Sequence, residues 1–276
     1  MLNLKKGIYG CLFLCLPALH ADPARADDPT CPAARIDEYA VVRYVHDGDT
    51  VRLQDGRKIR LIGINAPELA TDDKPAELLA TDARDALRST INAHDKRVGL
   101  VFGKQRKDHY GRTLAHLFTP EGENLQADLL EQGLAAALTI PPNDRFTDCY
   151  RLAEQAARCM HSGLWSLPDF ASTQTTALNA DASGFRLINA KVVHVSHNAK
   201  GVWLTLSGGV LIGVHTADLA AFDETELLAL KGVPVRVRGW LQPKKQRGNK
   251  HDIRFYMRIR HPAALEIRPA NTDAKC

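Results

Sequence analysis

The sequence predicts an α+β, mainly β fold built from two five-stranded barrels, the first of which carries packed helices. Three observations support this prediction. The 276 residues are enough for two small domains with buried cores. Short strand patterns separated by Asp-Gly turn signals come early and are followed by helical patterns. A stretch rich in small and polar residues then precedes a second, strand-rich region.

The N-terminus has the pattern of a signal peptide. Two lysines precede the apolar run Ile8–Leu19, and Ala-Arg-Ala follows at 24–26. Because a bilayer span needs about 20 apolar residues, residues 1–26 are interpreted as a signal peptide, cleaved after Ala21 or Ala26. A buried helix and a lipoprotein site at an early cysteine are the alternatives. We therefore expect an exported protein, periplasmic or extracellular, with no membrane association beyond the signal peptide.

Export would leave four cysteines in an oxidising compartment, where disulfides form. Cys149 and Cys159 lie ten residues apart in one helical pattern, which is about 15 Å along a helix axis. The Cα atoms of a disulfide lie at most about 7 Å apart, so these two cannot pair. We expect a Cys31–Cys149 bridge that ties the mature N-terminus to this helix. No Cys-x-x-Cys spacing supports a zinc site.

Strand patterns open the region 37–167. They fall at Ala40–His46, Thr50–Gln54 and Lys58–Ile64, separated by the Asp-Gly turns at residues 47–48 and 55–56. Later patterns predict strands at Arg97–Phe102 and Thr113–Thr119 and helices at Pro75–Asn92, Leu125–Gln132 and Thr147–His161. This order predicts a small barrel with helices packed on it.

Charge divides the chain into two regions. Residues 37–167 contain 17 basic against 20 acidic residues, a net charge of −3, whereas residues 184–268 contain 14 against 6, a net charge of +8. Residues 168–183, rich in Ala, Ser, Thr, Asn and Asp, are interpreted as a linker between two domains. A polyanion would be drawn first to the second domain.

The second domain is strand-rich. Strands are expected at Phe185–Ser196, Gly201–Leu206, Val210–His215, Val235–Leu241 and Ile253–Arg260, with a short helix at Asp223–Leu230. Five strands with one helix between the third and fourth fit an OB-fold.

Candidate chemistry begins where Asp47-Gly48-Asp49-Thr50 is followed by the segment Arg60 to Glu68. By itself, Asp-Gly indicates only a hairpin turn. However, the oxygens of Asp49 and Asn65 suit a hard cation, which prefers oxygen ligands. Arg60 offers a planar fork for two phosphate oxygens, and Glu68 could reach a water beside the cation. An EF-hand is excluded because Arg52 occupies the position that needs glycine.

A second basic segment runs from Lys104 to Arg112 and includes Asp108-His109-Tyr110-Gly111-Arg112. Taken alone, it is typical of a solvated loop with a tight turn at Gly111. Arg112 opens the next predicted strand and is therefore held more rigidly than a residue at a loop tip.

Together, Asp47–Thr50, Arg60–Glu68 and Asp108–Arg112 resemble the staphylococcal nuclease (thermonuclease) family in order and spacing. The resemblance covers about residues 38–167, including the helices. It implies an OB-fold-type barrel and calcium-dependent hydrolysis of phosphodiester bonds in DNA and RNA, with 3′-phosphate products.

The resemblance also implies a metal site. Calcium would be held by the Asp49 and Asn65 side chains and by the backbone carbonyl of Ala66. The family has aspartate where this chain has Asn65, so one negative charge is lost and weaker calcium binding is expected. Ala66 replaces a threonine, which matters little if only its carbonyl binds the ion.

Catalytic roles follow from the same resemblance. Glu68 would act as general base or orient the attacking water, while Arg60 and Arg112 would bind the phosphate and stabilise charge that develops on it. Tyr110 and His109 would contact the nucleotide. His109 replaces a family lysine, and a second substrate-facing tyrosine is lost, with Thr139 nearby.

Alternation in the last two strands predicts a basic face on the second domain. Arg236, Arg238, Arg254 and Tyr256 would lie on the side opposite the apolar residues, next to a basic loop at 244–250. An OB-fold commonly binds single strands on such a face, so these residues are predicted to bind nucleic acid. The alternative is a solvated face with a charged edge that resists aggregation.

We therefore predict an exported, calcium-dependent nuclease that acts on DNA and/or RNA as a monomer. The alternative is a catalytically weak nucleic-acid-binding protein with a nuclease-like fold, for which the only argument is Asn65. A zinc hydrolase is not supported, because no His-Glu-x-x-His motif or cysteine ligand set is present.

Overall fold

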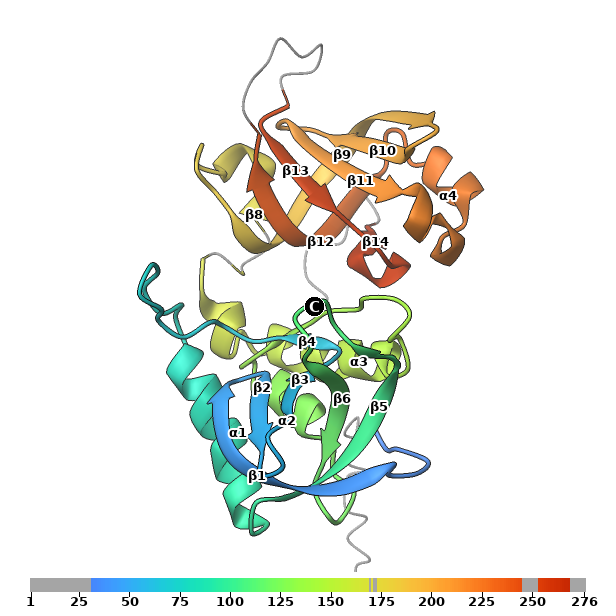
Figure 1. Ribbon diagram of the computed structural model, residues 1–276. Coiled ribbons are helices and arrows are strands. Elements are labelled where there is room, and N and C mark those ends of the chain that lie inside the picture. The colour runs from blue at the N-terminus through green and yellow to red at the C-terminus, as the bar shows by residue number, and fades with distance from the viewer. Residues whose placement is uncertain (1–30, 169, 171–172, 245–252, 269–276) are drawn as a thin grey trace, which may run out of the picture.

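The computed structural model describes residues 31–168, 170, 173–244 and 253–268. The predicted signal peptide and most of the basic loop at 244–250 lie outside the described residues. Two β-barrels follow one another along the chain (Figure 1). Among the described residues, no helix is both long and apolar enough to span a membrane.

The first barrel is closed and has the strand order β1-β2-β3-β6-β5. Its strands are β1 (Glu38–Asp47), β2 (Thr50–Leu53), β3 (Lys58–Leu61), β5 (Arg97–Lys107) and β6 (Thr113–Phe118). The β3–β6 pair is parallel and the other pairs are antiparallel. Every second side chain along these strands points inward, and apolar side chains fill the interior of the barrel, as the sequence pattern predicts.

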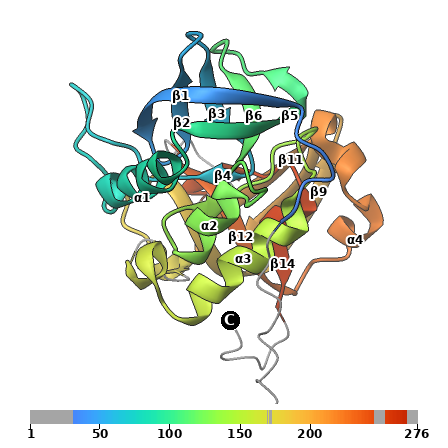
Figure 2. The same ribbon diagram turned by 90° about the horizontal axis from the view of Figure 1, so that it is seen from below.

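Three α-helices accompany this barrel: α1 (Ala80–Ala93), α2 (Leu125–Glu131) and α3 (Thr147–Cys159). Figure 2 shows α2 beside α3, to one side of the strands. Asn124 caps α2 by accepting hydrogen bonds from two backbone N–H groups of its first turn. The helix expected from Pro75 begins only at Ala80, because Leu79 adopts a left-handed conformation (φ 66°) that breaks the helical path.

The second barrel repeats the strand order of the first. Its strands are β9 (Gly184–Asn198), β10 (Gly201–Leu206), β11 (Val210–His215), β12 (Pro234–Pro243) and β13 (Phe255–Arg258). They run in the order β9-β10-β11-β13-β12, and pairing of β12 with β9 closes the barrel. The β11–β13 pair is parallel, as β3–β6 is. A helix, α4 (Glu224–Leu228), follows the third strand, as α1 does in the first barrel, so both predicted OB-type barrels are confirmed.

Shorter elements complete the described chain. They are strands β4 (Ile64–Asn65), β7 (Ala136–Ala137), β8 (Thr173–Gln174) and β14 (Leu265–Ile267), and 3₁₀ helices Gly163–Ser166, Thr175–Ala177, Thr216–Ala221 and Pro262–Ala264. Part of the predicted linker is therefore ordered as β8, which pairs with β9.

An apolar cluster and a buried ion pair join the two barrels. Ala157 of α3 and Trp165 pack with Phe185 and Leu187 of β9. Beside them, Arg238 of β12 donates hydrogen bonds to both carboxylate oxygens of Glu154 in α3, at 2.9 and 2.7 Å. The Arg238 and Glu154 side chains are 5% and 1% exposed, so this pair is fully desolvated. The face of β12 that carries Arg238 therefore covers the first barrel.

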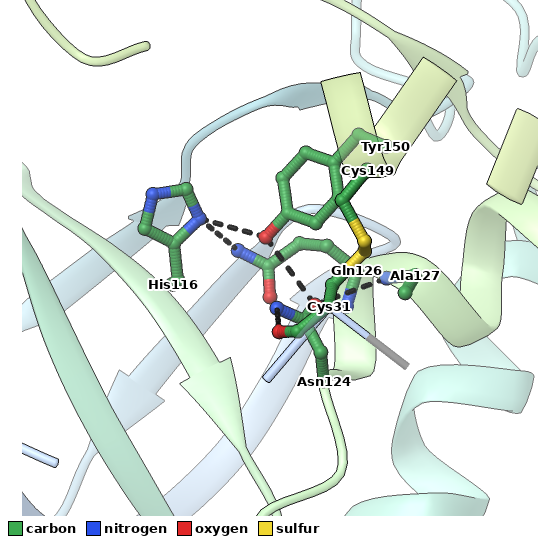
Figure 3. Close-up of a disulfide and its surroundings, with 7 residues drawn as sticks. All are labelled: Cys31, His116, Asn124, Gln126, Ala127, Cys149 and Tyr150. Carbon is green, nitrogen blue, oxygen red and sulfur yellow. Dashed lines mark hydrogen bonds between the residues drawn. A yellow bond between two sulfur atoms is a disulfide. The ribbon is translucent and has the colours of Figure 1, made fainter. Parts of the chain in front are cut away.

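The predicted disulfide between Cys31 and Cys149 is confirmed, with Cα atoms 5.6 Å apart (Figure 3). It lies beside a buried polar network. The Tyr150 hydroxyl donates to Asn124 at 3.2 Å and lies 2.7 Å from Nδ1 of His116. Asn124 in turn donates to the Cys31 carbonyl. Cys159 is also disulfide-bonded.

Candidate active site

Asp49 lies in the tight turn between β1 and β2 and is 3% exposed. It accepts hydrogen bonds from the Thr50 hydroxyl at 3.0 Å and from the backbone N–H of Ala66 at 3.1 Å. Gly48 permits this approach, because a Cβ at that position would lie 2.7 Å from the Cβ of Ala66. Burial raises the pKa of Asp49 to about 6, although Arg60 opposes the shift.

Asn65 and Ala66 are positioned by a break in the third strand of the barrel. The expected strand at 58–64 is interrupted at Gly63, which has φ 91°. A Cβ at Gly63 would lie 2.3 Å from the ring of Tyr150, so only glycine fits both the backbone conformation and the space. The chain resumes as β4, which pairs with β7. Asn65 therefore lines a cleft instead of continuing along the barrel.

Arg60 of β3 extends toward the same turn. Its guanidinium lies 2.8 Å from a carboxylate oxygen of Asp49 and donates to the backbone carbonyl of Ile64 at 3.1 Å. The side chain is 15% exposed, so it is held firmly while one part reaches the cleft. Arg60 thus joins the strand to the turn and to the loop that carries Glu68.

Glu68 lies in the loop after β4 and lines the cleft. Its backbone N–H donates to the carboxylate of Glu77 at 3.1 Å, which ties the two ends of the loop together. Partial desolvation and the Asp49 carboxylate raise the pKa of Glu68, while Arg60 and Arg112 oppose the rise. The charges of Asp49, Arg60 and Arg112 therefore lie close enough to Glu68 to change its pKa.

Arg112 is oriented by Asp108. Its Nε donates to Asp108 at 2.7 Å, and its backbone N–H donates to the other carboxylate oxygen at 2.9 Å. Partial burial raises the pKa of Asp108, but the hydrogen bonds from Arg112 and Tyr110 lower it by more. The pKa of Asp108 is therefore below its ordinary value. Tyr110 is 73% exposed, packs against His109 and lies 5.3 Å from the Arg112 guanidinium. An open aromatic face and an oriented cation thus stand side by side.

The cleft that joins these residues has a volume of about 1470 Å³ and is lined by both barrels. This is more than the roughly 300–1,000 Å³ of most small-molecule sites, and suits an extended ligand. Five basic and three acidic side chains line it, namely Arg60, Lys74, Arg112, Arg186 and Arg260 against Glu68, Glu77 and Asp108. The lining therefore favours an anion.

The residues beside Asp49 fit a hard divalent cation. Asp49 contacts the backbone N–H of Ala66, and the side-chain oxygens of Asp49 and Asn65 with the carbonyl of Ala66, which belong to one turn and the loop it contacts, would be the oxygen donors for such an ion. A buried carboxylate with a raised pKa is the group that a bound cation would stabilise. In the described part of the chain, no cluster of three or more His, Cys, Asp or Glu side chains forms an alternative metal site.

Arg236 and Arg238 have partners within the protein, so their contact with nucleic acid stays a prediction. Arg238 is buried against Glu154, and Arg236 is bonded to Asn189 and Glu266. Burial lowers the pKa of Arg236 to about 10. The alternation predicted from the sequence is correct, but on the face opposite the apolar residues Arg238 contacts the first barrel and Arg236 is bonded to neighbouring strands of the second.

The other two predicted residues of this face are also engaged. Arg254 donates to the backbone carbonyls of Gly208 and Thr175, and the Tyr256 hydroxyl lies 2.6 Å from Nε2 of His215. Neither residue lines the cleft. Their contact with nucleic acid stays a prediction.

Sequence reasoning missed Glu77, which closes the loop of Glu68, and the orienting role of Asp108. Asp108 lies in the recognised segment Asp108–Arg112, and its spacing of four residues from Arg112 could have indicated that the two side chains pair. The sequence reasoning also missed that the second barrel lines part of the cleft.

Comparisons with known proteins agree with this geometry. The family model described as staphylococcal nuclease homologue matches residues 58–167. A thermonuclease of Staphylococcus hyicus is 31% identical over 131 residues, which is 46% of this chain and 75% of that protein. Endonuclease YncB of Bacillus subtilis is 32% identical over 125 residues, 44% of this chain and 58% of that protein. Endonuclease YhcR of the same organism is 30% identical over 169 residues, covering 57% of this chain and 14% of that protein. This chain therefore belongs to the staphylococcal nuclease family.

Proposed function

We propose that this chain is a calcium-dependent nuclease that hydrolyses phosphodiester bonds of DNA, RNA or both. The observation that carries the proposal is that Arg60, Glu68 and Arg112 converge on one cleft beside the buried carboxylate of Asp49. Phosphoryl transfer needs mainly positioning and positive charge, and this arrangement offers both. The family relatives, whose names describe them as thermonucleases and endonucleases, support the same activity.

Asp49, Asn65 and the carbonyl of Ala66 would hold the calcium ion, which when bound would polarise a phosphate oxygen. Arg60 and Arg112 would bind the non-bridging phosphate oxygens, and their charge would stabilise the transition state. Asp108 keeps Arg112 aimed at the cleft.

Glu68 would accept a proton from the attacking water, or orient that water, at its carboxylate. Its raised pKa makes it a better proton acceptor than an ordinary surface glutamate. Tyr110, with His109 against it, would contact the base or sugar of the nucleotide.

We infer that the protein is exported and acts as a monomer. The Cys31–Cys149 disulfide and the disulfide of Cys159 support export, because such bonds persist in oxidising compartments. Residues 37–167 would carry the chemistry and residues 184–268 would assist nucleic-acid binding.

Cleavage of DNA and RNA in parallel, with calcium or with a chelator, tests the proposal. The wild-type chain should cleave at least one substrate only with calcium. Glu68→Ala should lower kcat by about 10²–10⁴-fold, as the loss of a general base does. Glu121→Ala is the matched control, because this carboxylate pairs with His94 and does not line the cleft. Binding without calcium-dependent cleavage would favour the alternative, a nucleic-acid-binding protein with little catalytic activity.

A further inference from the structure

The side of the second barrel that faces the first is covered at Arg238 of β12, whereas Trp240, further along the same strand, lines the cleft. Side chains of a strand alternate between its faces, so Arg236, Arg238 and Trp240 share one face. Arg236 and Arg238 are bonded to residues that include Glu154 and Glu266. Trp240, the next residue on that face, is 42% exposed and lines the cleft that contains Glu68.

Trp240 is held in place by its neighbours. Its ring packs edge-on against Phe185, at 5.7 Å between ring centroids, and the two residues are paired across β9 and β12. Phe185 belongs to the apolar cluster that joins the barrels. The buried Arg238–Glu154 pair lies two residues away on the same strand. The position of Trp240 relative to the catalytic cleft is therefore fixed by the core of the interface.

The cleft carries an open aromatic side chain from each barrel. Among the described residues, the exposed tyrosine and tryptophan side chains are Tyr39, Tyr44, Tyr110 and Trp240, and only the last two line the cleft. Arg186 and Arg260 of the second barrel line it as well and add positive charge. Aromatic faces combined with cations are the features by which proteins hold single strands.

We propose that Trp240 stacks on a base of a single nucleic-acid strand and so makes the second barrel one wall of the substrate cleft. This rests on the proposed nuclease function and extends it to a substrate class, single-stranded DNA or RNA. Stacking requires an unpaired base, because the faces of bases inside a duplex are covered by their neighbours. The second barrel thus contributes through Trp240 at the cleft, not through the predicted basic face at Arg236 and Arg238.

Affinity for a fluorescently labelled 12-nucleotide single strand, measured by anisotropy with a chelator present to prevent cleavage, tests this. Trp240→Ala should weaken binding by about 5- to 150-fold, the range that loss of one base–aromatic stack gives. Trp240→Phe should retain most of the affinity. Trp203→Ala is the matched control, since Trp203 is a partly exposed tryptophan of the second barrel that does not line the cleft.

Two further measurements separate stacking from a structural effect of Trp240. In a Trp203→Phe background, binding of the strand should quench tryptophan fluorescence, and adding Trp240→Phe should remove the quenching, because Trp165 is buried. With calcium, Trp240→Ala should raise KM for the single strand and leave kcat within about twofold.

Unchanged affinity in Trp240→Ala, or an equal loss in Trp203→Ala, would overturn the proposal. Cleavage by the wild-type chain is measured in parallel. If the wild type cleaves while Trp240→Ala binds normally, only the stacking role fails. If the wild type does not cleave, the nuclease function fails, and the binding data still report on Trp240.

Discussion

Replacing Arg238 should lower the free energy of unfolding of the protein. We expect this loss of stability to be the main effect, and not the loss of a contact with nucleic acid. Arg238 bonds to both oxygens of Glu154 and to the Ala137 carbonyl, and Glu154 also accepts from the backbone N–H of Ala137. Because Glu154 is 1% exposed, Arg238→Met would leave a buried carboxylate that has lost its main counterion. Removing one partner of a buried ion pair costs about 3–5 kcal/mol.

Urea unfolding followed by circular dichroism measures this cost. The matched control is Lys104→Met, because Lys104 pairs with Asp144 on the first barrel and the two side chains are 68% and 38% exposed. That control should lose less than about 1 kcal/mol, as partly exposed ion pairs do. Adding Glu154→Gln to Arg238→Met should recover part of the loss, because the unpaired charge is removed. A loss below 1 kcal/mol for Arg238→Met would refute the view that this pair holds the barrels together.

Three other outcomes are expected. Asn65→Asp should tighten calcium binding in a calorimetric titration, since it adds a negative charge at the cation site, and equal affinities would contradict the assignment of Asn65 as a ligand. Replacing Cys31 and Cys149 together by alanine should lower the free energy of unfolding by about 2–5 kcal/mol, because the bridge closes a loop with a sequence separation of 118; an unchanged urea midpoint would show that the bridge adds no stability. Burial lowers the pKa of His116 from 6.5 to about 3, so stability present above pH 6.5 is lost as pH falls toward 3. His116→Asn should therefore show a smaller drop in Tm between pH 7 and pH 5 than the wild type, and identical drops would show that His116 does not contribute.

Local sequence patterns were sufficient for most of the barrel strands. Gly201–Leu206 and Val210–His215 were predicted with the observed bounds, because alternating apolar residues end at glycines or polar turns. Helix geometry excluded a bond between Cys149 and Cys159, and the bridge that was preferred among the remaining pairings, Cys31–Cys149, is confirmed.

Contacts between distant residues account for the differences. The break of the third strand at Gly63 depends on the ring of Tyr150, which lies far along the chain in α3. Arg238 lies in a strand with the predicted alternation, but its partner Glu154 is 84 residues away. No local pattern indicates which face of a barrel another barrel will cover, so it could not be predicted that Trp240, and not Arg238, lines the cleft.

The same limit applies to the candidate site. Its segments were recognised in order and spacing, and Asp49, Arg60, Glu68 and Arg112 lie close together in the structure. The hydrogen bonds that orient them, such as those from Arg112 to Asp108, depend on backbone geometry that the sequence does not specify.

Anomalous diffraction from crystals of the Glu68→Ala variant grown with calcium and a short oligonucleotide would test the central claim most directly. The account predicts a calcium peak bonded to Asp49 and Asn65, with a phosphate of the strand between Arg60 and Arg112. A calcium ion bound elsewhere, with Arg60 still paired to Asp49 and no phosphate beside Arg112, would contradict it.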